Sequence, residues 1–231
     1  DVERSRGLGD VYKRQGITGC SNTSGGGTGV ANEDGLVVLN VASTGQPVSF
    51  DPADANLVVN EYTEYDCYDT LLDFNQDGTD VVPALAESWE QVDDLTYTYK
   101  IREGVKFSDG SDLTMDDVLY SLNRVREDAY GMSYLFEHVD SFEVDERTRT
   151  LTVHLTQPDS TWKYVPATTP CQILKKSVVE AEGDAYGTNE GSVVGTGPYK
   201  FVSWAADSQI VLEKNEYWWG GADNLAIDKL S

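Results

Sequence analysis

The chain has 231 residues, of which 39% are hydrophobic, and it contains 13 Tyr and 5 Trp, enough to bury a core in one or two domains. Its formal net charge is −23, from 17 Lys and Arg against 40 Asp and Glu. This balance argues against nucleic acid as a partner, because phosphate binding requires Lys and Arg to displace counterions. No apolar run approaches the roughly 20 residues that span a bilayer, so we expect a soluble body with a strongly solvated surface.

Residues 1–15 are charged and lack the apolar segment of roughly 7–15 residues that a signal peptide carries before its cleavage site. The hexapeptide DVYKRQ at residues 10–15 can be encoded by the end of a transposon adapter used in sequencing libraries. We therefore interpret residues 1–15 as an assembly artefact that replaced the natural segment, and we exclude them from the fold prediction.

Residues 16–35 predict a lipid anchor followed by a tether. The tetrapeptide ITGC at residues 17–20 resembles the lipobox of bacterial lipoproteins, which implies cleavage before Cys20 and a diacylglycerol thioether on its sulfur. The Ser- and Gly-rich run that follows cannot bury apolar surface and is typical of a flexible tether. The plainer alternative is a cysteine in a disordered tail.

Patterning along the rest of the chain predicts a mixed α/β protein. The apolar run at residues 36–42 indicates a buried strand, and spacings of three and four predict a helix over residues 57–72. The segment Asp73–Gly78 matches the first half of a calcium loop, but the twelfth position, where a Glu is needed, is Ala84. We therefore favour a polar turn in which Gly78 adopts positive φ.

Three hairpins and one capped helix follow in chain order. Alternating side chains predict the hairpins over residues 89–102, 142–155 and 199–213. Thr114 and the acids after it form a capping box that begins an apolar-striped helix. His154 falls on the polar positions of the second hairpin.

The cysteines and histidines leave two questions open. If Cys20 carries lipid, Cys67 and Cys171 remain as a pair that forms either a disulfide or two buried thiols. His138 and His154 are too few and too isolated for a zinc site, so no metal site is predicted.

The order of short motifs resembles family 5 of the bacterial extracellular solute-binding proteins, the oligopeptide, dipeptide and nickel-chelate receptors of ABC importers. The resemblance covers about residues 36–231, and its motifs are FDP at 50–52, YDTLL at 68–72, PALAESW at 83–89, REGVKFSDG at 102–110 and GTGPYKF at 195–201. The lipobox fits this reading, because many members are lipoproteins.

The resemblance implies a periplasmic-binding-protein-like (type II) two-lobe clamp, of which this chain holds only the first lobe with its extra α/β subdomain. We expect residues 51–194 to form that subdomain, and residues 36–50 and 195–231 to form the incomplete hinge-proximal part of the lobe. The position of Ser231 near the crossover into the second lobe implies an N-terminal fragment of a longer protein.

The resemblance also implies a lipid-anchored, extracytoplasmic monomer that captures di- and oligopeptides for an ABC permease and its ATPase subunits, without a cofactor. Ligand-cleft positions carried over by motif are Asn56, Val58, Tyr130 and Tyr134, although each Tyr could instead be ordinary packing. Nickel-chelate or oligosaccharide binding and a peptide-sensing module without transport remain as alternatives.

An enzyme is the remaining rival, and the sequence argues against it. Neither G-x-S-x-G nor H-E-x-x-H is present. The acid pairs at 93–94 and 116–117 are adjacent in sequence, so their side chains diverge rather than form a dyad. The segment Gly195–Tyr199, with its two glycines, predicts a turn and not a phosphate loop, because no Gly-Lys-Ser/Thr sequence follows it.

Overall fold

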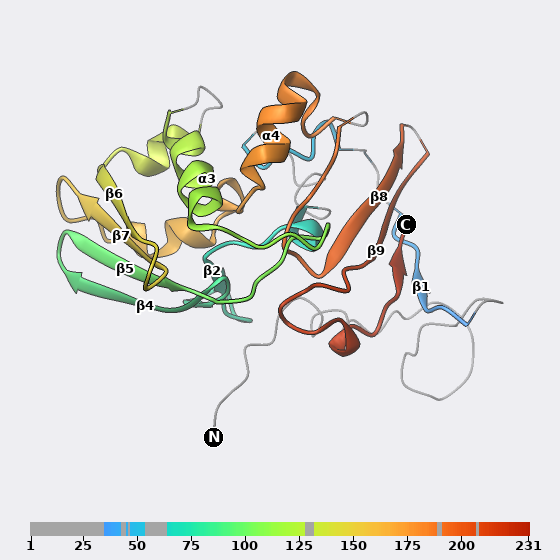
Figure 1. Ribbon diagram of the computed structural model, residues 1–231, viewed down its shortest axis with the longest axis horizontal. Coiled ribbons are helices and arrows are strands. Elements are labelled where there is room, and N and C mark those ends of the chain that lie inside the picture. Colours follow the sequence, from blue (N-terminus) through green and yellow to red (C-terminus); the bar gives the residue numbers. More distant parts are fainter. Residues whose placement is uncertain are drawn as a thin grey trace.

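A computed structural model of the chain describes residues 35–42, 45, 47–53, 64–127, 132–188, 191–206 and 208–231. Two four-stranded sheets lie toward opposite ends of the molecule, and helices α3 (Met115–Glu127) and α4 (Lys176–Glu182) lie between and above them (Figure 1). Among the residues that the structure describes, none of the helices combines the length and the hydropathy that a bilayer span requires.

The first sheet is fully antiparallel and has the strand order β4-β5-β7-β6, with strands β4 (Ala86–Asp93), β5 (Thr96–Ile101), β7 (Thr150–Leu155) and β6 (Val139–Asp145). The hairpins predicted over 89–102 and 142–155 are therefore confirmed. On β5 and β7 alternate residues are buried, as a half-buried sheet requires. His154 lies on the opposite, more open face, 3.7 Å from Glu143 between Nε2 and Oε2.

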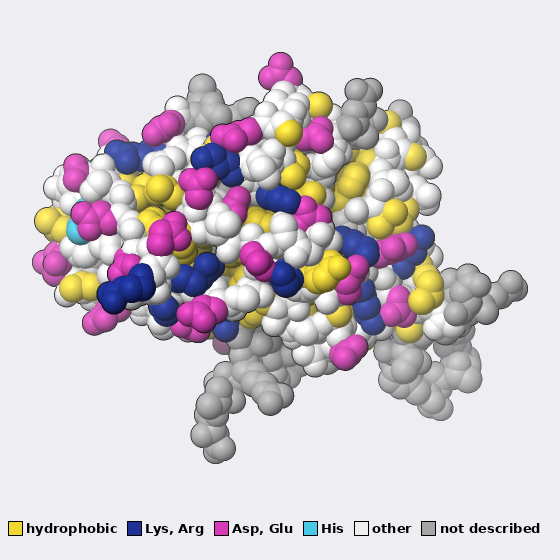
Figure 2. Space-filling view, viewed as in Figure 1, with side chains coloured by type: hydrophobic (Ala, Val, Ile, Leu, Met, Phe, Trp, Pro, Cys, Tyr) yellow, Lys and Arg dark blue, Asp and Glu magenta, His cyan; other side chains and the backbone are white. Residues whose placement is uncertain are grey.

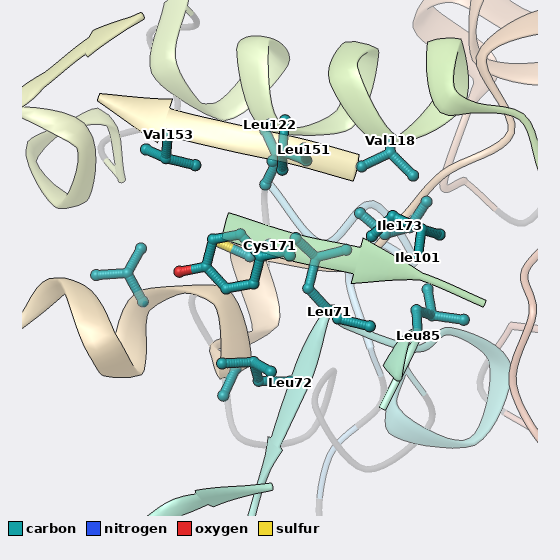
Figure 3. Packing of buried hydrophobic residues seen from close by; sticks show 14 of the residues in the cluster. Leu71, Leu72, Leu85, Ile101, Val118, Leu122, Leu151, Val153, Cys171 and Ile173 are labelled. Carbon is teal, nitrogen blue, oxygen red and sulfur yellow. The ribbon is translucent and has the colours of Figure 1, made fainter. Parts of the chain in front are cut away.

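Helix α3 covers the buried face of this sheet. Its capping box has the predicted reciprocal form: the Asp117 amide donates to Thr114 Oγ1 at 3.1 Å, and the Thr114 amide donates to Asp117 Oδ2 at 3.0 Å. The apolar stripe that includes Val118 and Leu122 is buried, and Figure 3 shows both side chains beside Leu151 of β7.

The second sheet has the order β1-β10-β9-β8, with strands β1 (Val38–Leu39), β10 (Lys229–Leu230), β9 (Gln209–Lys214) and β8 (Tyr199–Ala205). The third predicted hairpin is confirmed as β8 and β9. The buried strand predicted at 36–42 is wrong in length and burial. Its strand β1 has two residues, which pair in parallel with β10 at the sheet edge, and Leu36 is 44% exposed.

A short hairpin of β2 (Leu72–Phe74) and β3 (Val81–Pro83) replaces the end of the helix predicted over 57–72. In the described part, helical residues end at Cys67. The prediction failed there because an apolar pair such as Leu71-Leu72 suits either structure, and burial in the core beside β3 selects the strand.

The turn after β2 is polar, as predicted. The Asn75 Oδ1 atom accepts hydrogen bonds from the amides of Thr79 at 2.8 Å and Asp80 at 3.1 Å, and Gly78 has φ of 65°. The chain's own backbone therefore uses the oxygen that a calcium loop would direct at its ion. Short 3₁₀ segments connect other described elements: η1 (Ser133–Phe136), η2 (Trp162–Ala167), η3 (Thr169–Cys171), η4 (Gly183–Ala185) and η5 (Ala222–Asn224).

Two hydrophobic cores result. The larger core lies between the first sheet, α3 and β2, and Figure 3 shows part of it. The smaller core joins Phe50, Cys67 and Tyr68 to β8, β9, α4 and the segment that ends at Val193. Leu174, Val179, Tyr186 and Val193 thus share one core with residues of β8 and β9. The division of the chain into subdomains stays a prediction.

The two described cysteines are separate, free and buried, so the disulfide alternative is wrong and the buried-thiol alternative is right. Cys67 belongs to the smaller core and Cys171 to the larger core, where Figure 3 shows it. Burial raises the pKa of the Cys171 thiol to about 12 and, with help from the nearby Asp66 carboxylate, raises that of Cys67 well above its usual value. Both thiols are therefore protonated and unreactive at neutral pH.

Candidate functional site

The ligand-cleft residues expected from sequence fall on two segments. Asn56, Val58 and Tyr130 lie outside the described residues, as does Cys20. Tyr134 lies on η1 and is 64% exposed, so its ring is not ordinary core packing. Asp51, just before the segment 54–63, contacts Arg124, just before the segment 128–131. We call the region around this contact the corner, and it is the candidate site.

An ion pair between Asp51 and Arg124 forms the centre of this corner. Arg124 Nη1 donates to Asp51 Oδ1 at 2.7 Å, and Nη2 donates to Oδ2 at 2.5 Å, in the bidentate geometry that a guanidinium and a carboxylate favour. The Arg124 side chain is only 12% exposed and the Asp51 side chain only 7%. The pair therefore ties the turn that precedes residues 54–63 to the last turns of α3, which lead into residues 128–131.

The turn that carries Asp51 is held from three sides. The Asp51 amide donates to Ser49 Oγ at 3.0 Å, and the Ala53 amide donates to Asp51 Oδ1 at 3.1 Å. The Phe50 amide donates to the Gly187 carbonyl at 2.6 Å. Gly187 has φ of 77°, and a Cβ atom there would lie 2.6 Å from the Asp51 nitrogen, so only glycine fits.

Two tyrosines close the inner side of the corner. The hydroxyls of Tyr68 and Tyr186 are 2.9 Å apart and hydrogen-bonded, and the Arg124 guanidinium carbon is 5.9 Å from the centre of the Tyr186 ring. Burial raises the pKa of both hydroxyls above their usual value, so both stay neutral. The corner thus combines one ion pair, whose two charges cancel, with neutral tyrosine hydroxyls that form hydrogen bonds.

A shallow surface pocket opens beside the ion pair. Its lining comes from one face of α3, at positions spaced by three and four: Tyr120, Asn123, Arg124 and Glu127. Lys176 of α4 lies at its edge, with Nζ 5.8 Å from the centre of the Tyr120 ring. This lining carries both hydrogen-bond donors and acceptors.

Sequence reasoning missed this pairing, although Asp51 lay in the quoted motif at 50–52. Asp51 and Arg124 are 73 positions apart, and no local pattern links them. One signal was available: charged residues inside otherwise apolar motifs are rarely buried without a partner.

The glycine motif at 195–199 makes the turn that was expected. The Gly197 amide donates to the Cys67 carbonyl at 3.0 Å, and Asn215 Nδ2 donates to the Gly197 carbonyl at 2.8 Å. A Cβ atom on Gly195 would lie 2.0 Å from the Cys67 oxygen. The glycines therefore allow close backbone approach and leave no room for a phosphate.

Elsewhere the surface is mixed in charge. Figure 2 shows acidic and basic side chains interspersed over one face, in keeping with a solvated exterior. Within the described ranges, no group of three or more His, Cys, Asp or Glu side chains could hold a metal ion.

Residues 80–231 match the family described as Bacterial extracellular solute-binding proteins, family 5 Middle. The chain is 30% identical over 197 residues to the Probable D,D-dipeptide-binding periplasmic protein DdpA of Escherichia coli (strain K12), covering 81% of this chain and 38% of that protein. It is 28% identical over 205 residues to Heme-binding protein A of Haemophilus influenzae, covering 78% and 37%.

The fold is similar to the crystal structure of Haemophilus influenzae OppA in complex with RPPGFSPFR. The TM-score is 0.75 at 25% sequence identity, over 87% of this chain and 42% of that one. The chain thus spans about two fifths of the length of the proteins that it resembles.

Proposed function

This chain belongs to family 5 of the bacterial extracellular solute-binding proteins and has part of their type II periplasmic-binding-protein fold, and on that premise we propose that it is the ligand-capturing first lobe of a peptide receptor. The receptor would bind di- or oligopeptides outside the cytoplasm and deliver them to the permease of an ABC importer. The family consists of binding proteins, and we propose no catalytic step for this member.

The match of residues 80–231 to this family carries the proposal. The site geometry supports it, because the buried Asp51–Arg124 pair fixes the described ends of both segments to which the family resemblance assigns ligand contacts. We propose that these segments offer their backbone N–H and C=O groups to the ligand. Main-chain pairing of that kind binds an extended peptide whatever its side chains are.

Closure of the clamp would make this binding productive. A ligand that contacts both lobes only in the closed form shifts the population toward that form by its differential affinity. We propose that the closed receptor then docks on a permease while separate subunits hydrolyse ATP. We further propose that lipid on Cys20, followed by the tether to residue 35, keeps the receptor at the membrane.

Binding by the full-length product of the parent gene, expressed from Cys20 with Cys20→Ser, tests the ligand class. Calorimetry and thermal shift would compare peptides of two to six residues with nickel–histidine, haem and an oligosaccharide. We expect stabilisation by peptides of varied sequence. The similarity to a haem-binding protein favours a non-peptide ligand as the second candidate, and stabilisation by one such ligand alone would replace the peptide assignment.

A matched pair of variants tests main-chain recognition. Asn56→Pro removes a backbone N–H donor, whereas Asn56→Ala removes only the side chain. We expect peptide affinity to fall about tenfold or more in Asn56→Pro, the equivalent of one lost hydrogen bond, and to change less than about threefold in Asn56→Ala. The opposite order would show that the Asn56 side chain makes the contact.

A sensing role without transport uses the same clamp and is decided by partners. Permease and ATPase genes beside the parent gene, with ligand-dependent uptake lost on deletion, support import. Peptide binding without any uptake defect would support sensing.

A further inference from the structure

Gln172, directly after η3, carries a buried side-chain amide whose hydrogen-bonding groups are unused. The residue is 1% exposed, and among the described residues neither its Oε1 nor its Nε2 atom has a hydrogen-bond partner. Most buried polar side chains in proteins are paired, because an unpaired buried amide lowers stability. An amide of this kind is therefore a candidate for binding another molecule.

On one side of this amide lies α3. Asp117 Oδ1 accepts a hydrogen bond from the Lys176 amide at 3.0 Å, and Ser121 Oγ accepts one from the Leu174 amide at 2.9 Å. Two residues of extended chain and four residues of helix both advance about 6–7 Å. Gln172 is therefore placed beside the following turn of α3, the turn that contributes the arginine of the corner.

On the other side lies the chain that follows the segment 54–63. Thr169 Oγ1 donates to the Tyr65 hydroxyl at 2.9 Å, and the Ile173 amide donates to the Asp69 carbonyl at 2.9 Å. These partners come shortly after one of the two segments that we propose for ligand binding, whereas the end of α3 leads into the other. The buried amide thus lies between the approaches to both segments.

The direction of the side chain follows from the extended backbone. Gln172 has φ of −62° and ψ of 139°, and Lys175 is also extended, so side chains here alternate between two sides. Ile173 packs in the larger core, as Figure 3 shows, and Leu174 packs in the smaller core. Gln172 therefore lies on the side of Leu174, toward the smaller core and the corner.

We propose that Gln172 is a specificity-determining residue that binds the backbone of the peptide, a role that rests on the proposed function. Its Oε1 atom accepts from a peptide N–H group and its Nε2 atom donates to a peptide C=O group, since a primary amide offers both. Such a contact is independent of the ligand's side chains. Because the amide is buried before binding, the contact requires the residues that cover it to shift.

The variant Gln172→Met, made in the full-length protein with Cys20→Ser, tests this role. Methionine has a similar length but lacks both hydrogen-bonding groups. We expect the unliganded variant to unfold at the same temperature as the parent or higher, because an unpaired buried amide is removed. Affinity for tetra-alanine and for peptides with other side chains should fall about tenfold or more, and by a similar factor for each.

Gln91→Met is the matched control. Gln91 is an exposed residue of β4, so the same chemical change there should alter neither the unfolding temperature nor the affinity.

Methylated ligands test which peptide group is bound. Tetra-alanine is methylated at one peptide nitrogen at a time, which removes one N–H donor in each analogue. At the position bound by Gln172, methylation should weaken binding to the parent and to Gln91→Met at least about fivefold more than binding to Gln172→Met. Equal losses in all three proteins at every position would overturn the proposal.

The affinity measurements separate this inference from the proposed function. If the parent binds peptides and Gln172→Met binds them equally well, Gln172 is not a ligand contact and the peptide receptor stands. A lower unfolding temperature with unchanged affinity would likewise assign Gln172 a structural role. If the parent binds no peptide, both proposals fail.

A crystal structure of the full-length parent protein with tetra-alanine needs no variant that must fold. We expect an Oε1 or Nε2 atom of Gln172 within about 3.2 Å of a main-chain atom of the peptide. An amide that is bonded only to protein or water in that complex would overturn the proposal.

Discussion

The two cores are built in different ways. The larger core rests on hairpins whose strands are neighbours in sequence, β4 with β5 and β6 with β7. The smaller core joins one local hairpin, β8 with β9, to distant pieces: β1 pairs with β10, Phe50 bonds Gly187, and Tyr68 bonds Tyr186.

Buried polar groups lie around both cores, with Thr70 before β2, Asp117 and Ser121 on α3, and Thr169 and Gln172 at η3 beside the larger one. Several belong to the segments around the smaller core and its corner, namely Ser49, Asp51, Glu64, Asp66 and Asn215. Polar networks of this kind specify one arrangement but are costly when a partner is missing. The difference teaches that the larger core acts as a platform, while the smaller core fixes Phe50 and the turn of Asp51, just before one segment that we propose for ligand binding.

Breaking the ion pair should have the largest effect. Arg124→Ala leaves the Asp51 carboxylate buried without its cation, and we expect the free energy of unfolding to fall by about 3–5 kcal/mol. Denaturant unfolding measures the loss, and hydrogen exchange should place it in the smaller core. Arg126→Ala is the matched control two residues away. Its guanidinium donates to the exposed Asp140 carbonyl, and it should cost less than about 1 kcal/mol.

A cavity in the larger core should have the next largest effect. Leu151 lies on β7 and is fully buried on the face that α3 covers. We expect Leu151→Ala to lower the free energy of unfolding by about 2–5 kcal/mol. The neighbouring Thr152 side chain lies on the other face, so Thr152→Ala should change stability by no more than about 0.5 kcal/mol. If Leu151→Ala weakened peptide binding while the protein stayed folded, the larger core would be more than a platform.

The smallest effect is expected at the cap of α3, the helix that both cores share. Thr114→Ala removes the oxygen that accepts from the Asp117 amide and should cost about 1 kcal/mol. Thr114→Ser retains that oxygen and should cost less than half as much. Thermal unfolding of the two variants measures the difference, and an equal loss in both would show that the methyl group of Thr114, not its cap, is what matters.

Local chemistry by itself determined the larger part of the platform. Alternation at residues 89–102 and 142–155, the capping box at Thr114 and the polar turn before Gly78 were each readable, because the interactions that decide them lie within a few residues. The ordered motifs also indicated the family, which residues 80–231 confirm.

Only the tertiary structure decided what depends on distant partners. It ended the helix at Cys67, reduced β1 to two paired residues, and separated Cys67 from Cys171 in different cores. It also brought Asp51 to Arg124 across 73 positions. The physical reason is common to all four: burial and pairing between segments far apart in sequence outweigh local propensity, and no short window of sequence contains both partners.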